Sequence, residues 1–145
     1  MEVTIEDASI KFLDEYYEIE KQCFNREAFS KQQIGYLLTD YNAVGLTARV
    51  NGATVGFAIG RIDIVRNTVY GRILTVDIVP SYRRKGIAQK LLREIEAIFK
   101  AKGAKECRLE VREDNAAALS LYLKLGYKKS RQTGKVLWRR PWLVP

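Results

Sequence analysis

The sequence predicts an α/β fold in which a mixed sheet of about six or seven strands is combined with about four helices. Three observations carry this prediction. Stretches rich in β-branched and aromatic residues alternate with stretches in which apolar residues recur every three or four positions. Turns that contain glycine or proline separate many of these stretches. With 145 residues the chain is long enough to bury one core, and we expect a single domain over residues 1–145.

The first part of the chain predicts a strand followed by two helices. Residues 3–5 are typical of a short strand, and residues 10–24 space their apolar side chains as a helix does. Ser30 is expected to cap a second helix that runs to about Asp40, because its hydroxyl can accept a hydrogen bond from a first-turn amide.

A hairpin and a third strand are predicted next. Asn51-Gly52 tolerates the positive φ angles of a tight turn and separates two strand-like stretches, Ala43–Val50 and Ala53–Val65. A second turn leads into a strand over residues 68–79, which Pro80 ends.

The second half of the chain alternates helices and strands. Ile87, Leu91, Ile95 and Ile98 fall on one stripe of a helix that Gly103 ends. The remaining elements are a strand over residues 105–112, a helix from Asp114 or Asn115 to about Leu125, and a terminal hairpin of residues 127–132 and 135–138 around Thr133-Gly134. No internal repeat or linker interrupts this order.

Composition limits the classes of protein that the chain can belong to. Apolar residues make up 47% and charged residues 29%, which is typical of a globular protein and leaves no uninterrupted membrane span. The N-terminal stretch carries acids where a secretory signal carries basic residues, so we expect a cytoplasmic protein that does not enter a membrane. The net charge of +8 favours anionic partners.

The residue types that are present also limit the chemistry. The chain contains no histidine, which removes the imidazole base of many hydrolases and the commonest transition-metal ligand. Cys23 and Cys107 lie far apart without the spacing of metal ligands. We therefore expect no metal site, and acid–base chemistry must come from Glu, Asp, Tyr, Lys or Cys.

A basic turn that contains glycine, residues 80–86, connects the strand predicted over residues 68–79 to the helix that follows. A helix start leaves backbone N–H groups without intrahelical partners and presents the positive end of the helix dipole, so a pyrophosphate can accept hydrogen bonds there. Gly86 lets the backbone approach a phosphate, and Ala88 keeps the first helical turn free of bulk. Arg84 and Lys85 add positive charge. The alternative is a solvated basic loop without a ligand.

The same turn resembles the signature of the GNAT acetyltransferase superfamily, Arg/Gln-x-x-Gly-x-Gly/Ala, which Arg83, Gly86 and Ala88 fill. The resemblance to the RimI-like and archaeal N-terminal (α-amino) acetyltransferases continues through three later stretches, residues 109–112, 115–118 and 121–127. It implies the GNAT fold, in which a splayed pair of parallel strands holds acetyl-CoA. It also implies an enzyme that transfers the acetyl group to an amine.

The resemblance further implies which residues hold acetyl-CoA. The backbone of Val76, Asp77 and Ile78 is expected to pair with the pantetheine, and an amide of this strand would stabilise the oxyanion that forms when an amine attacks the thioester. The other expected cofactor contacts are Arg83, Arg84, Lys85, Gly86, Ile87, Ala88, Gln89 and Asn115.

Glu110 and Tyr122 match the RimI-like positions of the general base and the general acid. Each also has a structural interpretation: Glu110 lies on a strand face where a merely solvated carboxylate is common, and Tyr122 can pack in the core. In the functional interpretation, the amine attacks directly in a ternary complex, Glu110 takes a proton from it and Tyr122 gives a proton to the leaving thiolate.

The acceptor is expected to be the N-terminal α-amine of a protein or peptide. At pH 7 a neutral α-amine costs about 1 kcal/mol to present and a neutral lysine side chain about 4.6 kcal/mol, so a weak carboxylate base suits the α-amine. Residues 128–135 lack the Tyr-Tyr pair and Gly-Glu-Asp-like stretch usual in N-terminal acetyltransferases, which predicts a more open and more basic acceptor groove. A lysine side chain, a polyamine or another small amine stays open as the acceptor.

Two interpretations from other classes remain. The charge of +8 could serve a non-enzymatic module that binds RNA or ribosomes, but no RNA-binding signature is visible, so nucleic acid is the less favoured partner. A degenerate domain could instead bind acyl-CoA as a sensor. The sequence leaves the acyl-chain preference and the oligomeric state open.

Overall fold

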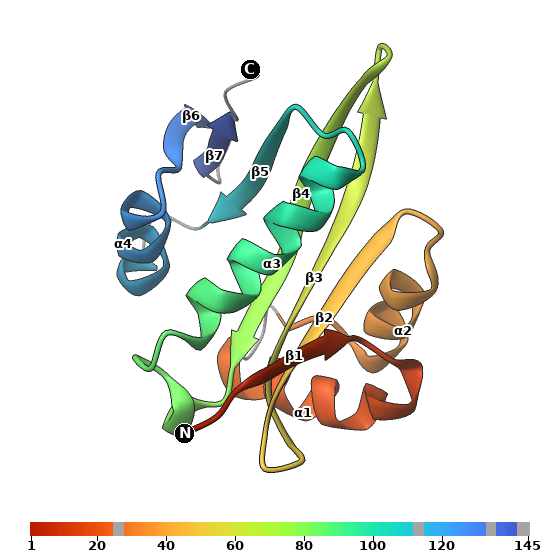
Figure 1. The fold of residues 1–145 in the computed structure, drawn as a ribbon, viewed down its shortest axis with the longest axis vertical. Coiled ribbons are helices and arrows are strands. Elements are labelled where there is room, and N and C mark those ends of the chain that lie inside the picture. The colour runs from red at the N-terminus through yellow and green to blue at the C-terminus, as the bar shows by residue number, and fades with distance from the viewer. Residues whose placement is uncertain (25–27, 112–114, 133–135, 142–145) are drawn as a thin grey trace.

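The computed structural model describes residues 1–24, 28–111, 115–132 and 136–141 (Figure 1). Its strands are β1 (Thr4–Asp7), β2 (Ala43–Val50), β3 (Ala53–Val65), β4 (Thr68–Ile78), β5 (Glu106–Val111), β6 (Lys128–Gln132) and β7 (Val136–Pro141). Its α-helices are α1 (Leu13–Phe24), α2 (Lys31–Thr39), α3 (Ile87–Ala101) and α4 (Ala116–Lys124). Short 3₁₀ helices, Ile10–Phe12 and Pro80–Tyr82, precede α1 and follow β4. The predicted α/β fold and the predicted order of elements are confirmed.

Local signals in the sequence set several of these boundaries. Ser30 caps α2 as expected: its hydroxyl accepts a hydrogen bond from the Gln33 amide at 3.1 Å, and the Gln33 side chain accepts one from the Ser30 amide at 2.8 Å. Asn115 caps α4 through a 3.1 Å hydrogen bond from a first-turn amide. Asp114, the alternative cap, and the turn at Thr133-Gly134 lie outside the described residues.

Two boundaries near the N-terminus differ from the prediction. The first strand runs to Asp7 instead of ending at residue 5, because all four of its residues pair with β2. The helix predicted over residues 10–24 begins with a 3₁₀ turn, in which the Ser9 side chain accepts a hydrogen bond from the Lys11 amide at 3.3 Å. Regular α-helix starts only at Leu13.

The seven described strands form one sheet in the order β1-β2-β3-β4-β5-β7-β6. Neighbouring strands are antiparallel except β4 and β5, which are parallel. α3 makes the crossover between these two strands and lies across one face of the sheet (Figure 1). The sheet is therefore mixed, as predicted.

The parallel pair separates soon after it forms. β4 and β5 are paired only from Gly71 with Cys107 to Ile73 with Leu109. At the next residue, Leu74, the register between β4 and β3 shifts, and such an irregularity bends a strand. Beyond this point β4 stays on β3, while β5 pairs with β7. We call the opening between the ends of β4 and β5 the fork.

Two apolar clusters attach the helices to opposite faces of the sheet. α3 packs the fully buried Leu91, Ile95 and Phe99 against one face. The Phe99 ring lies over Gly60 and Gly71, where a Cβ atom would come within 2.6 Å and 2.2 Å of it. α1 and α2 cover the other face through a second buried cluster. Both faces of β4 are therefore covered, and the fork opens at its edge.

Candidate active site

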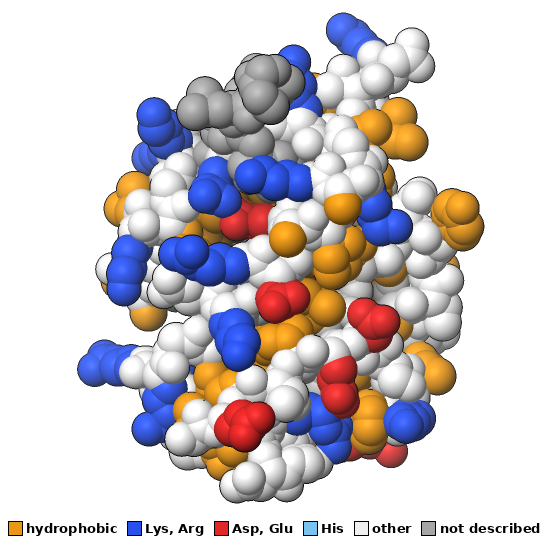
Figure 2. Space-filling model, in the orientation of Figure 1, with side chains coloured by type: hydrophobic (Ala, Val, Ile, Leu, Met, Phe, Trp, Pro, Cys, Tyr) orange, Lys and Arg blue, Asp and Glu red, His pale blue; other side chains and the backbone are white. Residues whose placement is uncertain are grey.

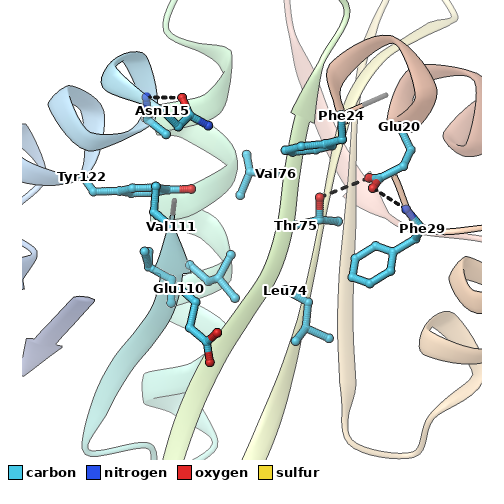
Figure 3. Close-up of a pocket in the computed structure, with 13 residues that line it drawn as sticks. Glu20, Phe24, Phe29, Leu74, Thr75, Val76, Glu110, Val111, Asn115 and Tyr122 are labelled. Carbon is cyan, nitrogen blue, oxygen red and sulfur yellow. Dashed lines mark hydrogen bonds between the residues drawn. The ribbon is translucent and has the colours of Figure 1, made fainter. Parts of the chain in front are cut away.

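A cleft of about 450 Å³ opens in the fork between β4 and β5 (Figure 3). α1 and Phe29, which lies shortly before α2, flank it on one side, and α4 flanks it on the other. The lining residues are Glu20, Phe24, Phe29, Ile73, Leu74, Thr75, Val76, Leu109, Glu110, Val111, Asn115, Ala118 and Tyr122. Four residues predicted for the site, Val76, Glu110, Asn115 and Tyr122, thus meet in one cleft.

Tyr122 reaches the cleft from α4 with its hydroxyl pointing inward (Figure 3). Its side chain is 8% exposed, and its ring packs edge-on against Tyr127 with 5.6 Å between the centroids. Burial raises the pKa of Tyr122 well above its ordinary value, and the nearby Cys107 and Asp77 add to this effect. The hydroxyl therefore keeps its proton and can donate a hydrogen bond into the cleft.

Glu110 lies at the rim of the same cleft and is bound to a cation. Its carboxylate forms a 2.7 Å ion pair with Arg72, and the two side chains are 38% and 40% exposed. Arg72 also reaches the Asp63 carboxylate at 3.9 Å. The Glu110 carboxylate points away from Tyr122 (Figure 3). Glu110 is therefore neither a freely solvated carboxylate nor an unpaired base.

The strand predicted to hold pantetheine is divided between the cleft and the core. Val76 lines the cleft, Ile78 belongs to the apolar cluster under α3, and the Asp77 side chain is fully buried on the α1 side. Beyond Ile73, β4 is no longer paired with β5 in the described register. The backbone groups on this edge of β4 can therefore bind an extended ligand.

The basic turn before α3 has the geometry of an anion site. Gly86 is the N-cap residue of α3, with φ +82° and no capping side chain, and a Cβ atom there would meet nothing within 4 Å. Arg84 also has a positive φ of +61°. Ile87, Ala88 and Gln89 form the first turn of the helix, where backbone N–H groups have no intrahelical acceptor.

The positive charge of this turn is divided between two roles. Arg83 folds back onto the end of β4: its Nε donates to the Ile78 carbonyl at 3.2 Å, and its Nη2 lies 3.3 Å from the Cys23 sulfur. Arg84 and Lys85 are exposed. Arg83 thus fixes the turn to β4 and α1, whereas Arg84 and Lys85 are the cations in position to meet an anion.

A buried acidic cluster on the α1 side of β4 was not predicted from the sequence. Glu20 is 1% exposed and Asp77 is 0% exposed. Thr75 Oγ1 lies 3.2 Å from Glu20 Oε1 and 2.5 Å from Asp77 Oδ1, and Glu20 Oε2 accepts a hydrogen bond from the Phe29 amide at 2.9 Å. Burial, and then the neighbouring Glu20, raise the pKa of Asp77 well above its ordinary value.

Sequence signals existed for part of this cluster. Glu20 lies four residues after Tyr16 and four before Phe24, on the buried stripe of α1, where an acid is unexpected unless it has a partner. Asp77 likewise interrupts an apolar strand. Phe29 had no such signal, because it lies between two helices, where periodicity gives no information.

Charge on the face that carries α3 is mixed. Lys and Arg side chains gather toward α4, and most Asp and Glu side chains lie across the middle and lower part of this view (Figure 2). Within the described ranges, no group of His, Cys, Asp or Glu side chains has an arrangement that could hold a metal ion. No helix in these ranges has the length and apolar character needed to cross a membrane.

The sequence profile of the acetyltransferase (GNAT) family matches residues 10–127 of the chain. N-alpha-acetyltransferase 30 of Schizosaccharomyces pombe is 35% identical over 102 residues, which cover 70% of this chain and 68% of that protein. An N-alpha-acetyltransferase of Sulfurisphaera tokodaii is 33% identical over 101 residues, which cover 63% of this chain and 60% of that protein. The chain thus spans less than two thirds of the length of this second relative.

A solved structure has the same fold. PaiA N-acetyltransferase from Thermoplasma acidophilum, in complex with coenzyme A, matches with a TM-score of 0.84 at 24% identity. The match covers 98% of this chain and 100% of that chain. The predicted fold with its splayed strand pair is therefore confirmed.

We predict that Asp77→Asn becomes more stable relative to the wild type as the pH rises. Because the pKa of Asp77 is raised in the folded state, the folded chain holds a proton that the unfolded chain releases above about pH 4. Wild-type stability therefore falls as the pH rises toward the raised pKa, and asparagine removes this loss. Urea unfolding at several pH values measures the difference, with Asp14→Asn on α1 as the matched control. A difference that stays constant with pH contradicts the prediction.

Proposed function

The chain belongs to the acetyltransferase (GNAT) family, and we propose that it transfers the acetyl group of acetyl-CoA to the α-amine of a protein or peptide. Family membership makes it an acetyl-CoA-dependent N-acetyltransferase. The observation that carries the proposal is the cleft in the fork, where the edge of β4 lies between the Tyr122 phenol on one side and the Glu20 carboxylate on the other. Two relatives named N-alpha-acetyltransferases support an α-amine as the acceptor.

The residues around the fork fit acetyl-CoA in an extended form. In this proposal the backbone of residues 76–78 pairs with the amides of pantetheine, because β5 has left this edge of β4. The pyrophosphate binds the first-turn amides of α3, where Gly86 leaves open space and Arg84 and Lys85 supply positive charge. Asn115 faces the cofactor from the opposite side of the cleft.

The reaction needs a neutral amine, a partner for the oxyanion and a proton for the leaving sulfur. We assign the oxyanion to a backbone amide on the edge of β4. We place the Tyr122 hydroxyl at the sulfur, where the sequence predicted a general acid. An ordinary phenol loses a proton to a thiolate at a cost of about 2 kcal/mol, and the raised pKa of Tyr122 increases that cost. The hydroxyl therefore stabilises the departing thiolate through a hydrogen bond, while the nitrogen supplies the net proton.

The charge of the cleft suits an acceptor that arrives as an ammonium ion. Glu20 and Glu110 both line it, whereas Tyr122 stays neutral. At pH 7 an α-amine loses its proton at a cost of about 1 kcal/mol, whereas a lysine side chain does so at a cost of about 4.6 kcal/mol. A carboxylate can therefore deprotonate an α-amine far more easily than a lysine side chain. Phe24 and Phe29 offer apolar surface beside Glu20 for the residues that follow the amine.

We predict that Gly86→Glu weakens acetyl-CoA binding by at least about 100-fold, because its carboxylate would repel the pyrophosphate. Gly86 has φ +82°, a conformation that strains any other residue, so the control must carry the same strain. Gly52→Glu is that control, since Gly52 has φ +80° and equally open surroundings. Calorimetry should show normal affinity for Gly52→Glu, and equal affinities of the two folded variants would remove the pyrophosphate site from this turn.

We predict that Tyr122→Phe lowers kcat by about 100-fold or more and leaves acetyl-CoA affinity nearly unchanged. The ring keeps its contact with Tyr127, and only the hydroxyl is lost. Steady-state kinetics and calorimetry separate the two effects. Tyr41→Phe, at a residue that is 99% exposed, is the matched control. Wild-type kcat in the Tyr122→Phe variant across the pH range would leave Tyr122 with a packing role only.

The acceptor is tested with three substrates that offer different types of amine. One peptide has a free N-terminus and no lysine, a second has a blocked N-terminus and one internal lysine, and a polyamine is the third acceptor. We expect kcat/KM for the free N-terminus to exceed the others by about tenfold or more at pH 7. Mass spectrometry identifies the acetylated nitrogen. A faster reaction of the lysine peptide or the polyamine would exclude the α-amine and leave the family assignment intact.

A further inference from the structure

The Thr75 hydroxyl bridges two buried carboxyl groups in a way that requires a shared proton. Its oxygen lies 3.2 Å from Glu20 Oε1 and 2.5 Å from Asp77 Oδ1, but it has only one proton to donate. It can therefore donate to one carboxyl group only. The second contact is a hydrogen bond only if the other carboxyl group is protonated. The bridge therefore contains at least one protonated carboxyl group.

The surroundings decide which of the two carboxyl groups holds the proton. Glu20 Oε2 accepts a hydrogen bond from the Phe29 amide at 2.9 Å, so an ionised Glu20 has two donors. Asp77 is 0% exposed, and among the described residues its Oδ2 has no hydrogen-bond partner. An ionised Asp77 would therefore be costly. Hydrogen bonds run from the Asp77 carboxyl to the Thr75 hydroxyl and from that hydroxyl to the Glu20 carboxylate.

Other ionisable groups face this pair from the elements packed around it. Arg83 lies at the end of β4 and partly opposes the rise in the pKa of Asp77. Cys23 on α1 has a pKa raised by its own burial and by Asp77. Tyr122 on α4 faces it from across the cleft. Cys23 and Tyr122 thus keep their protons, and the bridged pair carries one negative charge, which suits an incoming ammonium ion.

We propose that Glu20 accepts the proton of the attacking amine, and that Thr75 and Asp77 are positioning residues that hold its carboxylate ionised and oriented. Glu20 and Thr75 both line the cleft, on the opposite side of β4 from Tyr122 (Figure 3). The acceptor ammonium enters on the α1 side and meets this carboxylate there. The inference rests on the proposed function because it requires acetyl transfer to an amine. It does not require that this amine is an α-amine.

The transfer balances over one turnover. The acceptor ammonium gives a first proton to Glu20, and the freed electron pair forms the bond from nitrogen to the acetyl carbon. The carbon–sulfur bond breaks, and its electron pair leaves on sulfur. A second proton from nitrogen ends on sulfur, directly or through the Tyr122 hydroxyl. Glu20 then releases its proton to solvent, and Asp77 keeps its own throughout.

Glu20 and Glu110 both line the cleft, but they differ in their charge partners. Glu110 is bound to Arg72 at 2.7 Å and is 38% exposed, so protonation would sacrifice an ion pair. Glu20 is 1% exposed, and no ion pair to it is found among the described residues. Glu110 therefore already has a cation partner at the rim, whereas Glu20 is the cleft carboxylate without a cation partner among the described residues, in position to meet an incoming ammonium ion.

The kinetic test compares three glutamate-to-glutamine variants over a range of pH. In Glu20→Gln the amide oxygen can still accept from the Phe29 amide, and the amide nitrogen can donate to the Thr75 hydroxyl, so the fold is expected to persist, and calorimetry with acetyl-CoA checks it. We expect Glu20→Gln to lower kcat/KM by about 100-fold at pH 7, with a deficit that shrinks as the amine becomes neutral at high pH. Glu110→Gln should lose less, and Glu18→Gln, at an exposed site on α1, should match the wild type. A deficit that is constant with pH, or none, overturns the proposal.

The choice of acceptor separates this inference from the proposed function. The variants are assayed with the free-N-terminus peptide and with whichever amine of the panel reacts fastest. If another amine is preferred but Glu20→Gln shows the pH-dependent deficit with it, the α-amine proposal fails and this inference stands. If the peptide is acetylated and Glu20→Gln equals the wild type, the inference fails and the proposed function stands.

A second measurement needs no activity and no folded variant of Glu20. Carbon-13 NMR of wild-type protein labelled at its side-chain carboxyl carbons follows each Asp and Glu as the pH changes. We expect one aspartate to remain protonated at the pH of turnover, and its signal to be missing in Asp77→Asn. Carboxyl carbons that are all ionised at that pH would overturn the shared proton and with it the positioning role of Thr75 and Asp77.

Discussion

The cleft depends on one departure from regular strand pairing: β4 keeps β3 as its partner but loses β5 after Ile73. A strand that is paired on one edge exposes backbone N–H and C=O groups on the other, and these need a partner when they are buried. The register shift at Leu74 and the pairing of β5 with β7 both maintain this opening. α3 crosses between the two strands, so its unpaired first-turn amides start near the end of β4.

The alternation of side chains along β4 places different chemistry on its two faces. Val76 lines the cleft together with Tyr122, whereas Thr75 and Asp77 meet Glu20 of α1. Burial acts on both sides in the same direction: it raises the pKa of Tyr122 and that of Asp77, so both groups hold their protons. One strand thus presents an unpaired backbone edge to the cleft and contacts the Glu20 carboxylate through Thr75 on the α1 side.

The two glutamates that line the cleft have different surroundings, although their side chains are chemically identical. Glu110 is paired with Arg72 at an exposed rim, where such an ion pair contributes little to stability. Glu20 is held by an amide and a hydroxyl in the interior. The sequence predicted Glu110 as the base, whereas burial and the absence of a cation partner among the described residues are the grounds on which we propose Glu20.

The sequence by itself determined the features that depend on neighbours along the chain. The Ser30 cap, the hairpin at Asn51-Gly52 and the basic turn at Gly86 could be predicted because each needs only a few consecutive residues. The tertiary structure alone decided the contents of the cleft. Thr75 meets Glu20 across 55 residues and Arg72 meets Glu110 across 38, and only the sheet and the helix packed on it bring such residues together. Burial and charge pairing, which set the acidity of these groups, exist only once the chain has folded.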